Sequence, residues 1–443
     1  MRVDDWLARA AEALPERPAL VAGDRTLSFA ELESEARTTA RRVAGAGAGR
    51  GDRVALVLEP TADCVVLLHA LTKLGAVAVP LDPRAPAPDT DRLLAAAGAK
   101  LVLRSPAELA QAPEASDVEI GRDFDTDDVH CVLHTSGTAG EPTAVELTYG
   151  NHLWSAIGAG VRIGVAPTDR WLCCLPLHHI AGLSIVLRCA LYRIPIVLEP
   201  FEAAATAGTI ERQGVTIVSL VPTMLARLLD AGAPLERLRC ALIGGAAAPR
   251  SLIERALDAG VPVAPTYGLT ETASQVATMP PAEVRERPGS AGPPILSTEV
   301  RIDEDDRICV RGPTVAPGLA GEDGWLVTGD LGRVDEDGYL YALGRADDVI
   351  VSGGKNVSPG EVEDVLVEHP AVADAGVHGR EDPEWQHAVV AHVVLAAGSE
   401  ASEDDLRAFC RERLAPHKVP KAFVFVAELP RNAQDKLERH KLD

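Results

Sequence analysis

Hydrophobic and polar residues alternate along this chain with two different periods. Apolar residues at helical spacing begin after Ser28, the expected N-cap, with Glu31 as the acid of a capping box. A short apolar strand at 53–58, an apolar helix at 63–75 and a second strand at 76–83 follow. This order of strand, helix and strand predicts a parallel sheet.

The same alternation continues to about residue 270. Helices such as 223–232 and 250–260 separate further expected strands, which cover 171–177, 195–200, 216–222, 240–245 and 261–268. Glycine-rich turns follow two of these strands, in the strings LIGGAA and PTYGLTE. Ligands bind at the carboxyl ends of the strands in α/β sheets, so these turns mark the expected site.

The last third of the chain has a different pattern of hydrophobic and polar residues. Near residue 295 short strands and tight turns predict a mostly antiparallel section. Farther on, Ser358, Pro359 and Glu361 mark a helix start, as N-cap, first helical residue and capping-box acid.

These patterns together predict an α/β protein with two domains. The large N-terminal domain, residues 1–345, would contain mostly parallel sheets flanked by helices and an antiparallel, barrel-like section. The small C-terminal domain, residues 346–443, would be of the α+β class. A chain of 443 residues exceeds one ordinary hydrophobic core, which agrees with this division.

Composition and charge narrow the classes of function. The chain has 43 Lys and Arg against 65 Asp and Glu, a net charge of −22. This charge argues against nucleic acid or an anionic membrane as the main partner. An anionic substrate must therefore be met by local positive groups or helix N-termini.

The expected location is the cytoplasm. The chain begins with an amphipathic helical pattern rather than a signal peptide, and no apolar run is long enough for membrane insertion. The eight cysteines lie mostly in apolar runs, as reduced buried thiols do. The oligomeric state stays open, a homo-oligomer included.

Two groups of residues invite a metal-binding interpretation. Cys173-Cys174 precedes His178-His179, but neither adjacent pair has a spacing that lets both side chains reach one ion. We expect these residues, and His69 in its apolar helix, to belong to the core. The only metal predicted is the Mg²⁺ of a nucleotide site, described below.

One stretch, Cys131 to Gly140, has the composition of a phosphate-binding loop. An apolar strand passes into glycines and hydroxyl residues, which let backbone N–H groups and side-chain donors surround an anion. The expected contacts are Thr135, Ser136, Gly137, Thr138 and Gly140. Alone the signal is weak, because surface turns share this composition.

Six motifs occur in a specific order: TSGTAG (135–140), YGLTETA (267–273), TGDLG (328–332), GRADD (344–348), GGKNVSP (353–359) and PRNAQDK (430–436). In this order and spacing the chain resembles the adenylate-forming superfamily of acyl-CoA synthetases, luciferases and peptide-synthetase adenylation domains. The resemblance covers nearly the whole chain. It implies an enzyme that joins a carboxylic acid to the α-phosphate of ATP and then transfers the acyl group to a thiol, with ATP, Mg²⁺ and CoA.

The resemblance also implies roles for residues of these motifs. Tyr267, with Gly268, would stack on adenine, and Thr270 would meet the α-phosphate. Glu271 would hold Mg²⁺, which needs only one or two carboxylates besides phosphate oxygens. Asp330 would accept hydrogen bonds from the two ribose hydroxyls. The guanidinium of Arg345 would add N–H donors near the same sugar.

Lys436 is the catalytic lysine that the resemblance implies. It would neutralise charge developing on the attacking carboxylate and the α-phosphate. The small, mobile domain would then rotate about a hinge at Asp347 for the second half-reaction. After rotation Gly353 and Gly354 would approach the bound CoA.

Longer strings, such as LPLHHIAGLSIVLR (175–188) and PTYGLTETASQVATM (265–279), are most similar to the 2-succinylbenzoate–CoA ligase family of menaquinone biosynthesis. By this resemblance His179 would lie where acyl and thiol groups meet, as a catalytic and substrate contact. The wall between acyl pocket and nucleotide, together with nearby substrate contacts, would comprise Gly244, Gly245, Ala246, Ser297 and Thr298. Arg188 would bind the unreacted carboxylate of a dicarboxylate, although such an arginine is more often a helix residue reaching solvent.

Other functions of the same general type stay open. They are an aryl- or acyl-CoA ligase for benzoate-like or medium-chain acids, an adenylation enzyme that loads a carrier protein, and a non-catalytic nucleotide- or CoA-binding relative. The four chemistry-bearing residues present, Glu271, Asp330, Arg345 and Lys436, argue against the last.

The loop departs from the family pattern in charge. The family continues Gly-Lys-Pro-Lys, and this chain has Gly140-Glu141-Pro142-Thr143. An acid at Glu141 cannot neutralise pyrophosphate, so we expect it to face solvent and the affinity for ATP to be weak.

Overall fold

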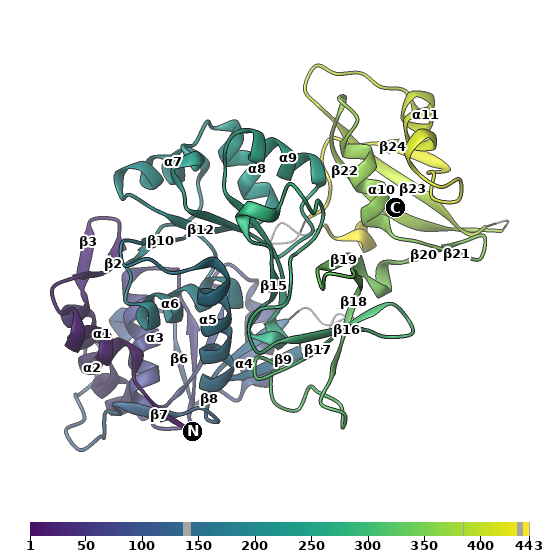
Figure 1. The fold of residues 1–443 in the computed structure, drawn as a ribbon. Coiled ribbons are helices and arrows are strands. Elements are labelled where there is room, and N and C mark those ends of the chain that lie inside the picture. Colours follow the sequence, from purple (N-terminus) through teal and green to yellow (C-terminus); the bar gives the residue numbers. More distant parts are fainter. Residues whose placement is uncertain (136–142, 384, 432–436, 443) are drawn as a thin grey trace.

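The computed structural model describes residues 1–135, 143–383, 385–431 and 437–442. The described chain begins with two sheets that pack on either side of shared helices (Figure 1). Within the described residues no helix combines the length and apolarity needed to cross a membrane.

Eight described strands form the larger sheet, in the order β15-β14-β13-β12-β10-β11-β2-β3. Neighbours from β14 to β2 are parallel, and the two edge strands are antiparallel. The strands are β2 (Pro18–Ala22), β3 (Arg25–Ser28), β10 (Trp171–Cys173), β11 (Ile196–Leu198), β12 (Ile217–Leu220), β13 (Cys240–Ile243), β14 (Val263–Leu269) and β15 (Ser274–Thr278).

Five strands of the described chain form a second sheet, in the order β6-β4-β5-β8-β9. It is parallel except for β9, which pairs antiparallel with β8. Its strands are β4 (Arg53–Val57), β5 (Val77–Leu81), β6 (Leu101–Leu103), β8 (Val129–Thr135) and β9 (Thr143–Thr148). A small antiparallel pair, β1 (Arg2–Asp4) with β7 (Asp123–Asp125), lies near the N-terminus.

Apolar faces of both sheets meet in one core, which is filled by helices α1 (Trp6–Ala13), α2 (Phe29–Gly45), α3 (Ala62–Leu74) and α6 (Ile180–Tyr192). A fifth helix, α5 (Tyr149–Ile163), packs beside α6. The outer face of the larger sheet is covered by α7 (Ala203–Arg212), α8 (Pro222–Asp230) and α9 (Arg250–Asp258), and that of the second sheet by α4 (Ala87–Ala97). Helices on both faces explain why the strands are apolar without alternation.

Four strands in the described part of the chain form an antiparallel sheet beyond residue 295: β16 (Glu299–Ile302), β17 (Arg307–Arg311), β18 (Leu326–Val334) and β19 (Leu340–Arg345). The α/β class and the antiparallel section are therefore as predicted. Short 3₁₀ turns complete this part, namely η1 (Pro106–Leu109), η2 (Leu235–Arg237), η3 (Thr270–Thr272) and η4 (Pro281–Glu283).

The C-terminal part packs around a core of its own, which draws only on residues from Ile350 to Phe423. Its described strands are β20 (Ile350–Ser352), β21 (Lys355–Val357), β22 (Val372–Asp382), β23 (Gln386–Leu395) and β24 (Ala422–Phe425). Two helices cover them, α10 (Pro359–Val367) and α11 (Glu403–Arg413). The turns η5 (Ala346–Asp348) and η6 (Arg439–Lys441) lie at its two ends.

The two predicted capping boxes have different outcomes. At Ser28 both hydrogen bonds of the box form with Glu31. Ser358 occupies the N-cap position, but the prediction of a capping box there is wrong. The Ser358 hydroxyl donates instead to the Leu343 carbonyl at 2.7 Å, and Glu361 accepts from Lys418. Tertiary partners outcompete the local ones at this helix start.

Burial confirms the core prediction for His69, Cys173 and Cys174, whereas His178 and His179 are only half-buried. His69 is 5% exposed inside α3, and burial lowers its pKa to about 4, as expected of a core histidine. The thiols of Cys173 and Cys174 point to different carbonyls, those of Leu175 and Ser219. The predicted N-terminal helix is shorter than expected, because residues 2–4 form β1.

Candidate active site

Three predicted site residues meet where β14 ends beside the antiparallel sheet. Asp330 on β18 lies opposite Arg345 on β19. Its carboxylate accepts a 2.7 Å hydrogen bond from the Tyr267 hydroxyl and a 3.3 Å bond from Arg345 Nη1. Burial, reinforced by the Asp330 charge, raises the pKa of Tyr267, so the phenol stays protonated and donates.

Gly329 explains how the Arg345 guanidinium reaches Asp330. A Cβ at residue 329 would lie 2.5 Å from Arg345 Nη2, closer than real Cβ atoms approach. The guanidinium therefore lies flat on the glycine backbone, which fixes its donor fork beside the carboxylate. This is a physical reason for glycine in the TGDLG motif.

The segment after Tyr267 is tightly constrained. A Cβ at Gly268 would lie 1.7 Å from the Ser274 carbonyl oxygen, so only glycine fits there. Ala273 and Ser274 have φ angles of 50° and 102°, a region that non-glycine residues seldom occupy. Such strain persists where surrounding structure imposes it, often at functional sites.

Glu271 lies in η3 within this constrained segment. Its backbone carbonyl accepts from Ala316 N at 2.8 Å. The half-buried carboxylate forms no hydrogen bond or ion pair with any residue that the structure describes. A carboxylate held in place but without a partner among the described residues fits the expected Mg²⁺ ligand, since Mg²⁺ binds through few carboxylates and keeps its waters and phosphate oxygens.

Arg188 is buried in α6, with 3% of its surface exposed. Its Nη2 donates to the Ser155 hydroxyl at 3.0 Å, and Ser155 donates to the Ala273 carbonyl at 2.6 Å. One hydroxyl therefore separates Arg188 from the strained segment that carries Glu271. The expectation that the side chain reaches solvent does not apply here.

The described part of the chain places no opposite charge against Arg188. No carboxylate of the described residues forms an ion pair with its guanidinium, and its buried Nε has no hydrogen-bond partner. The guanidinium carbon lies 6.0 Å from the Trp171 ring centre. Burial lowers the pKa of Arg188. A buried cation without a counter-charge costs several kcal/mol, which an anionic ligand would offset.

His179 lies at the N-cap position of the same helix, and its carbonyl accepts from Leu183 N at 3.0 Å. Its ring centre is 4.3 Å from that of His178. The His178 Nε2 atom in turn lies 3.8 Å from a carboxylate oxygen of Asp82, which follows β5. Residues after strands of both sheets thus meet at His178, the arrangement expected at the carboxyl ends of strands.

Several predicted residues lie outside the described chain. They are Ser136, Gly137, Thr138 and Gly140 of the phosphate loop, Glu141 beside them, and Lys436. Thr135 is described and pairs with Thr143, to whose carbonyl its hydroxyl donates at 3.4 Å. The two ends of the loop are therefore held together by the β8–β9 ladder.

The residues that follow Lys436 bind close in sequence to Arg345, which with Tyr267 and Asp330 forms what we call the Asp330 cluster. Arg439 in η6 donates to both carboxylate oxygens of Glu363, at 2.6 and 2.9 Å, and to Asp348 at 3.2 Å. Asp348 is only three residues beyond Arg345 in sequence. This end of the chain, the yellow segment in Figure 1, reaches back to β19.

Of the other predicted residues, Gly353 and Gly354 lie outside this cluster, and Asp347 lies at its edge. Gly353 and Gly354, with φ angles of 57° and 74°, form the turn between β20 and β21, and the Gly353 N–H donates to the Trp385 carbonyl at 2.8 Å. Asp347 is exposed, with one carboxylate oxygen 3.8 Å from Arg345 Nη2.

The expected wall residues follow β13. The Gly244 N–H donates to the Leu220 carbonyl at 3.1 Å, and Gly245 has a φ of 81°. Ala246 is exposed in the same turn. Ser297 is exposed, whereas Thr298 is 7% exposed and turned inward. No hydrogen bond joins Ser297 or Thr298 to Arg188 or Asp330 among the described residues.

Two residues that contact the predicted site residues were not themselves predicted from the sequence. Ser155 links Arg188 to Ala273, and Asp82 lies beside His178. Ser155 gave no signal, since it lies 33 residues from Arg188 within an ordinary amphipathic helix. The sequence did contain a signal for Asp82, because this residue directly follows a buried parallel strand.

Known proteins resemble this chain along its whole length. A family model described as AMP-binding enzyme matches residues 7–320, and one described as AMP-binding enzyme C-terminal domain matches residues 361–436. The chain is 40% identical to the 2-succinylbenzoate–CoA ligase of Bacillus licheniformis, over 99% of each protein.

Solved structures of o-succinylbenzoate CoA synthetase from Bacillus subtilis are similar in fold. One is a complex with the acyl-adenylate intermediate OSB-AMP, with a TM-score of 0.92, 36% identity, and coverage of 100% of this chain and 98% of that one. Another is a complex with ATP and magnesium ion, with a TM-score of 0.92, 36% identity and full coverage of both chains.

Proposed function

The chain belongs to the family of AMP-binding enzymes, and we propose that it is an AMP-forming ligase that converts 2-succinylbenzoate into 2-succinylbenzoyl-CoA. Its substrates are the acid, ATP and CoA, and its metal ion is Mg²⁺. In the first step the substrate carboxylate attacks the α-phosphate of ATP and pyrophosphate leaves. In the second step the CoA thiol attacks the acyl carbon and AMP leaves.

Side chains of the Asp330 cluster position the nucleotide in this proposal. The Asp330 carboxylate already accepts from Tyr267 and Arg345 and retains lone pairs for two ribose hydroxyls. Tyr267 is held by that bond with its ring available to stack on adenine. Thr270 donates to the α-phosphate, and Glu271 holds Mg²⁺, which neutralises phosphate charge when bound.

The observation that carries the choice of acid is Arg188. Its buried guanidinium has no carboxylate partner among the described residues, and it lies one hydroxyl from the segment that carries Glu271. A dicarboxylate supplies one carboxylate for reaction and a second for this cation. A benzoate-like or medium-chain monocarboxylate would leave the cation unpaired, which makes the other acyl-CoA ligase functions less suitable.

Replacing Arg188 with methionine tests this choice, because methionine fills similar volume without charge. We expect the KM for 2-succinylbenzoate to rise roughly 10- to 150-fold, the effect of losing a hydrogen bond to a charged group worth about 1.5–3 kcal/mol. The KM for a monocarboxylate analogue should change little. Steady-state kinetics with both acids measures the difference, and Arg188→Lys should recover part of it. Equal increases for both acids would remove Arg188 from the substrate pocket.

We also propose that the two domains have different roles in the reaction. A separate core beyond residue 349 supports a boundary at residues 345 and 346, with Asp347 as hinge. The position of Arg439 beside Asp348 supports placing Lys436 near the nucleotide for the first step. Gly353 and Gly354, which lie outside the Asp330 cluster in this arrangement, would approach CoA after rotation.

Glu141 gives a test of the unusual phosphate loop. We expect Glu141→Lys to lower the KM for ATP roughly fivefold, since an interaction of about 1 kcal/mol arises between two charges 4 Å apart in water. The gain should shrink at high salt, which screens exposed charges. Measuring the KM for ATP at two ionic strengths checks this. An unchanged KM at low salt would show that loop charge does not limit ATP binding.

We place the enzyme in the cytoplasm. All eight cysteines are free and buried, which supports a reducing compartment, and ATP and CoA are available there.

A further inference from the structure

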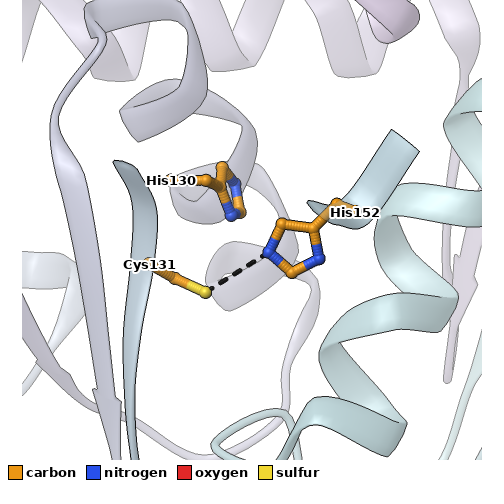
Figure 2. A group of neighbouring side chains, drawn as sticks. All are labelled: His130, Cys131 and His152. Atoms are coloured by element: carbon orange, nitrogen blue, oxygen red, sulfur yellow. Dashed lines mark hydrogen bonds between the residues drawn. The ribbon is translucent and has the colours of Figure 1, made fainter. Parts of the chain in front are cut away.

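A second cluster of reactive side chains lies inside the large part of the chain, and none of its members is assigned a contact with ATP (Figure 2). It consists of His130 and Cys131 on β8 and His152 on α5, with 1%, 0% and 3% of their surfaces exposed. Their potential ligand atoms all lie within 4.8 Å of one another. Figure 2 shows the two imidazoles and the thiol directed toward a common point.

An irregularity in β8 brings consecutive residues together. Side chains of neighbouring residues in a regular strand point to opposite faces of the sheet. The pairing of β8 with β9 shifts register between Val129 and Cys131, so His130 is the extra residue of a bulge. Bulges redirect a side chain, and here His130 turns toward the same side as Cys131.

The hydrogen bonds around His130 leave one ring nitrogen unused. Thr72 donates its only hydroxyl proton to the Leu68 carbonyl at 3.1 Å. With that proton used, the tautomer that completes the network has His130 Nε2–H donating to Thr72 Oγ1, 3.2 Å away. This places the free lone pair on Nδ1, which is buried and has no hydrogen-bond partner. Metal-binding histidines are typically held in this way, with the second nitrogen donating to a fixed acceptor.

The other two ligand atoms already have a suitable separation. Cys131 Sγ lies 3.4 Å from His152 Nε2. In a tetrahedral zinc site, bonds of 2.3 Å to sulfur and 2.0–2.1 Å to nitrogen put these atoms about 3.5 Å apart. One thiolate and two imidazoles form a soft ligand set that suits Zn²⁺ or Cu⁺, whereas Mg²⁺ and Ca²⁺ require oxygen ligands.

We propose that His130, Cys131 and His152 form a binding site for a thiophilic metal ion, Zn²⁺ or Cu⁺, separate from the Mg²⁺ of the ATP site. On binding, the Cys131 thiol loses its proton to solvent as the metal–sulfur bond forms. The ion would join β8, which leads to the phosphate loop at Thr135, to α5, which carries Ser155 one turn after His152.

The test uses the full-length protein expressed in medium supplemented with Zn²⁺ or with Cu⁺ under reducing conditions, because the buried site is best filled during folding. Metal content is then measured by mass spectrometry after desalting. We expect close to one equivalent of one of these ions in the wild type and its loss in Cys131→Ser and His152→Asn. The matched control is Cys410→Ser, which removes another buried free thiol from the C-terminal core and should keep the ion.

Two further measurements separate a metal site from a buried thiol–imidazole hydrogen bond. With Co²⁺ as probe, the wild type should show a thiolate-to-cobalt absorption band that is absent from Cys131→Ser. Thr72→Val, which removes the acceptor that fixes His130, should weaken Zn²⁺ or Cu⁺ binding about 10- to 100-fold. Wild-type protein without bound ion and without the Co²⁺ band would overturn the proposal, even if the variants fail to fold. Equal metal content in the wild type and Cys131→Ser would also overturn it.

Discussion

Lys436→Ala should slow adenylate formation roughly 100- to 1,000-fold. This is the usual effect of removing one preorganised donor that stabilises a transition state. In the first step the lysine would neutralise charge on the attacking carboxylate and the α-phosphate, and rotation of the small domain would remove it from the site for the second step. The described residues nearest in sequence support this position, because Arg439 is anchored to Asp348 and Glu363 beside the Asp330 cluster. Formation of the thioester from a supplied acyl-adenylate should remain largely intact.

Two assays separate these half-reactions for Lys436→Ala. ATP–pyrophosphate exchange reports the first, and release of AMP from supplied acyl-adenylate in the presence of CoA reports the second. Lys441→Ala is the matched control, since Lys441 belongs to the same terminal segment and pairs only with Glu438 among the described residues. Wild-type exchange activity in Lys436→Ala would exclude the lysine from the first step.

The second large effect is expected at Asp330. Asp330→Asn keeps the shape of the side chain and removes the charge that two ribose hydroxyls and Arg345 would share. Hydrogen bonds to a charged group contribute about 1.5–3 kcal/mol each, so kcat/KM for ATP should fall at least roughly 10- to 150-fold. Steady-state kinetics at varied ATP, with saturating acid and CoA, measures this fall.

Asp335→Asn is a close control for that variant. Asp335 also accepts from an arginine and a tyrosine, Arg287 at 3.1 Å and Tyr341 at 3.4 Å, but it lies in the turn beyond β18. Its loss should therefore lower stability without changing the KM for ATP. If both variants had the same kinetic effect, the role of Asp330 would be general stabilisation of the antiparallel sheet.

The alternation of strands and helices was predictable because each period reflects local geometry. The exact ends of the strands were harder to predict. The expected strand 171–177 ends at Cys173 in the structure, before Pro176, and Pro195 precedes the strand Ile196–Leu198. Proline has no N–H for the ladder, and Pro195 lies directly outside its strand, whereas the earlier strand already ends three residues before Pro176. The helix start at Ser358 was predicted correctly, but its cap was not, because the nearby Leu343 carbonyl competes for the hydroxyl.

The site residues likewise divide into those that the sequence predicted and those that it did not. Asp330, Arg345 and Tyr267 belong to motifs whose order is visible in the sequence, and the structure brings them together. The path from Arg188 through Ser155 to Ala273 joins three segments, with Ser155 and Ala273 118 residues apart. No local pattern encodes such a path. The direction of His130 was equally hidden, because it depends on a bulge in the pairing of β8 with β9.

The central claim is that this chain joins 2-succinylbenzoate to CoA at the expense of ATP, with release of AMP. The most direct test incubates the purified protein with ATP, Mg²⁺, CoA and a panel of acids that includes 2-succinylbenzoate, benzoate and a medium-chain fatty acid. Mass spectrometry then identifies the thioester and the nucleotide products. The account predicts 2-succinylbenzoyl-CoA with an equal amount of AMP, and the highest kcat/KM for this acid. Preference for a monocarboxylate, or release of ADP instead of AMP, would contradict it.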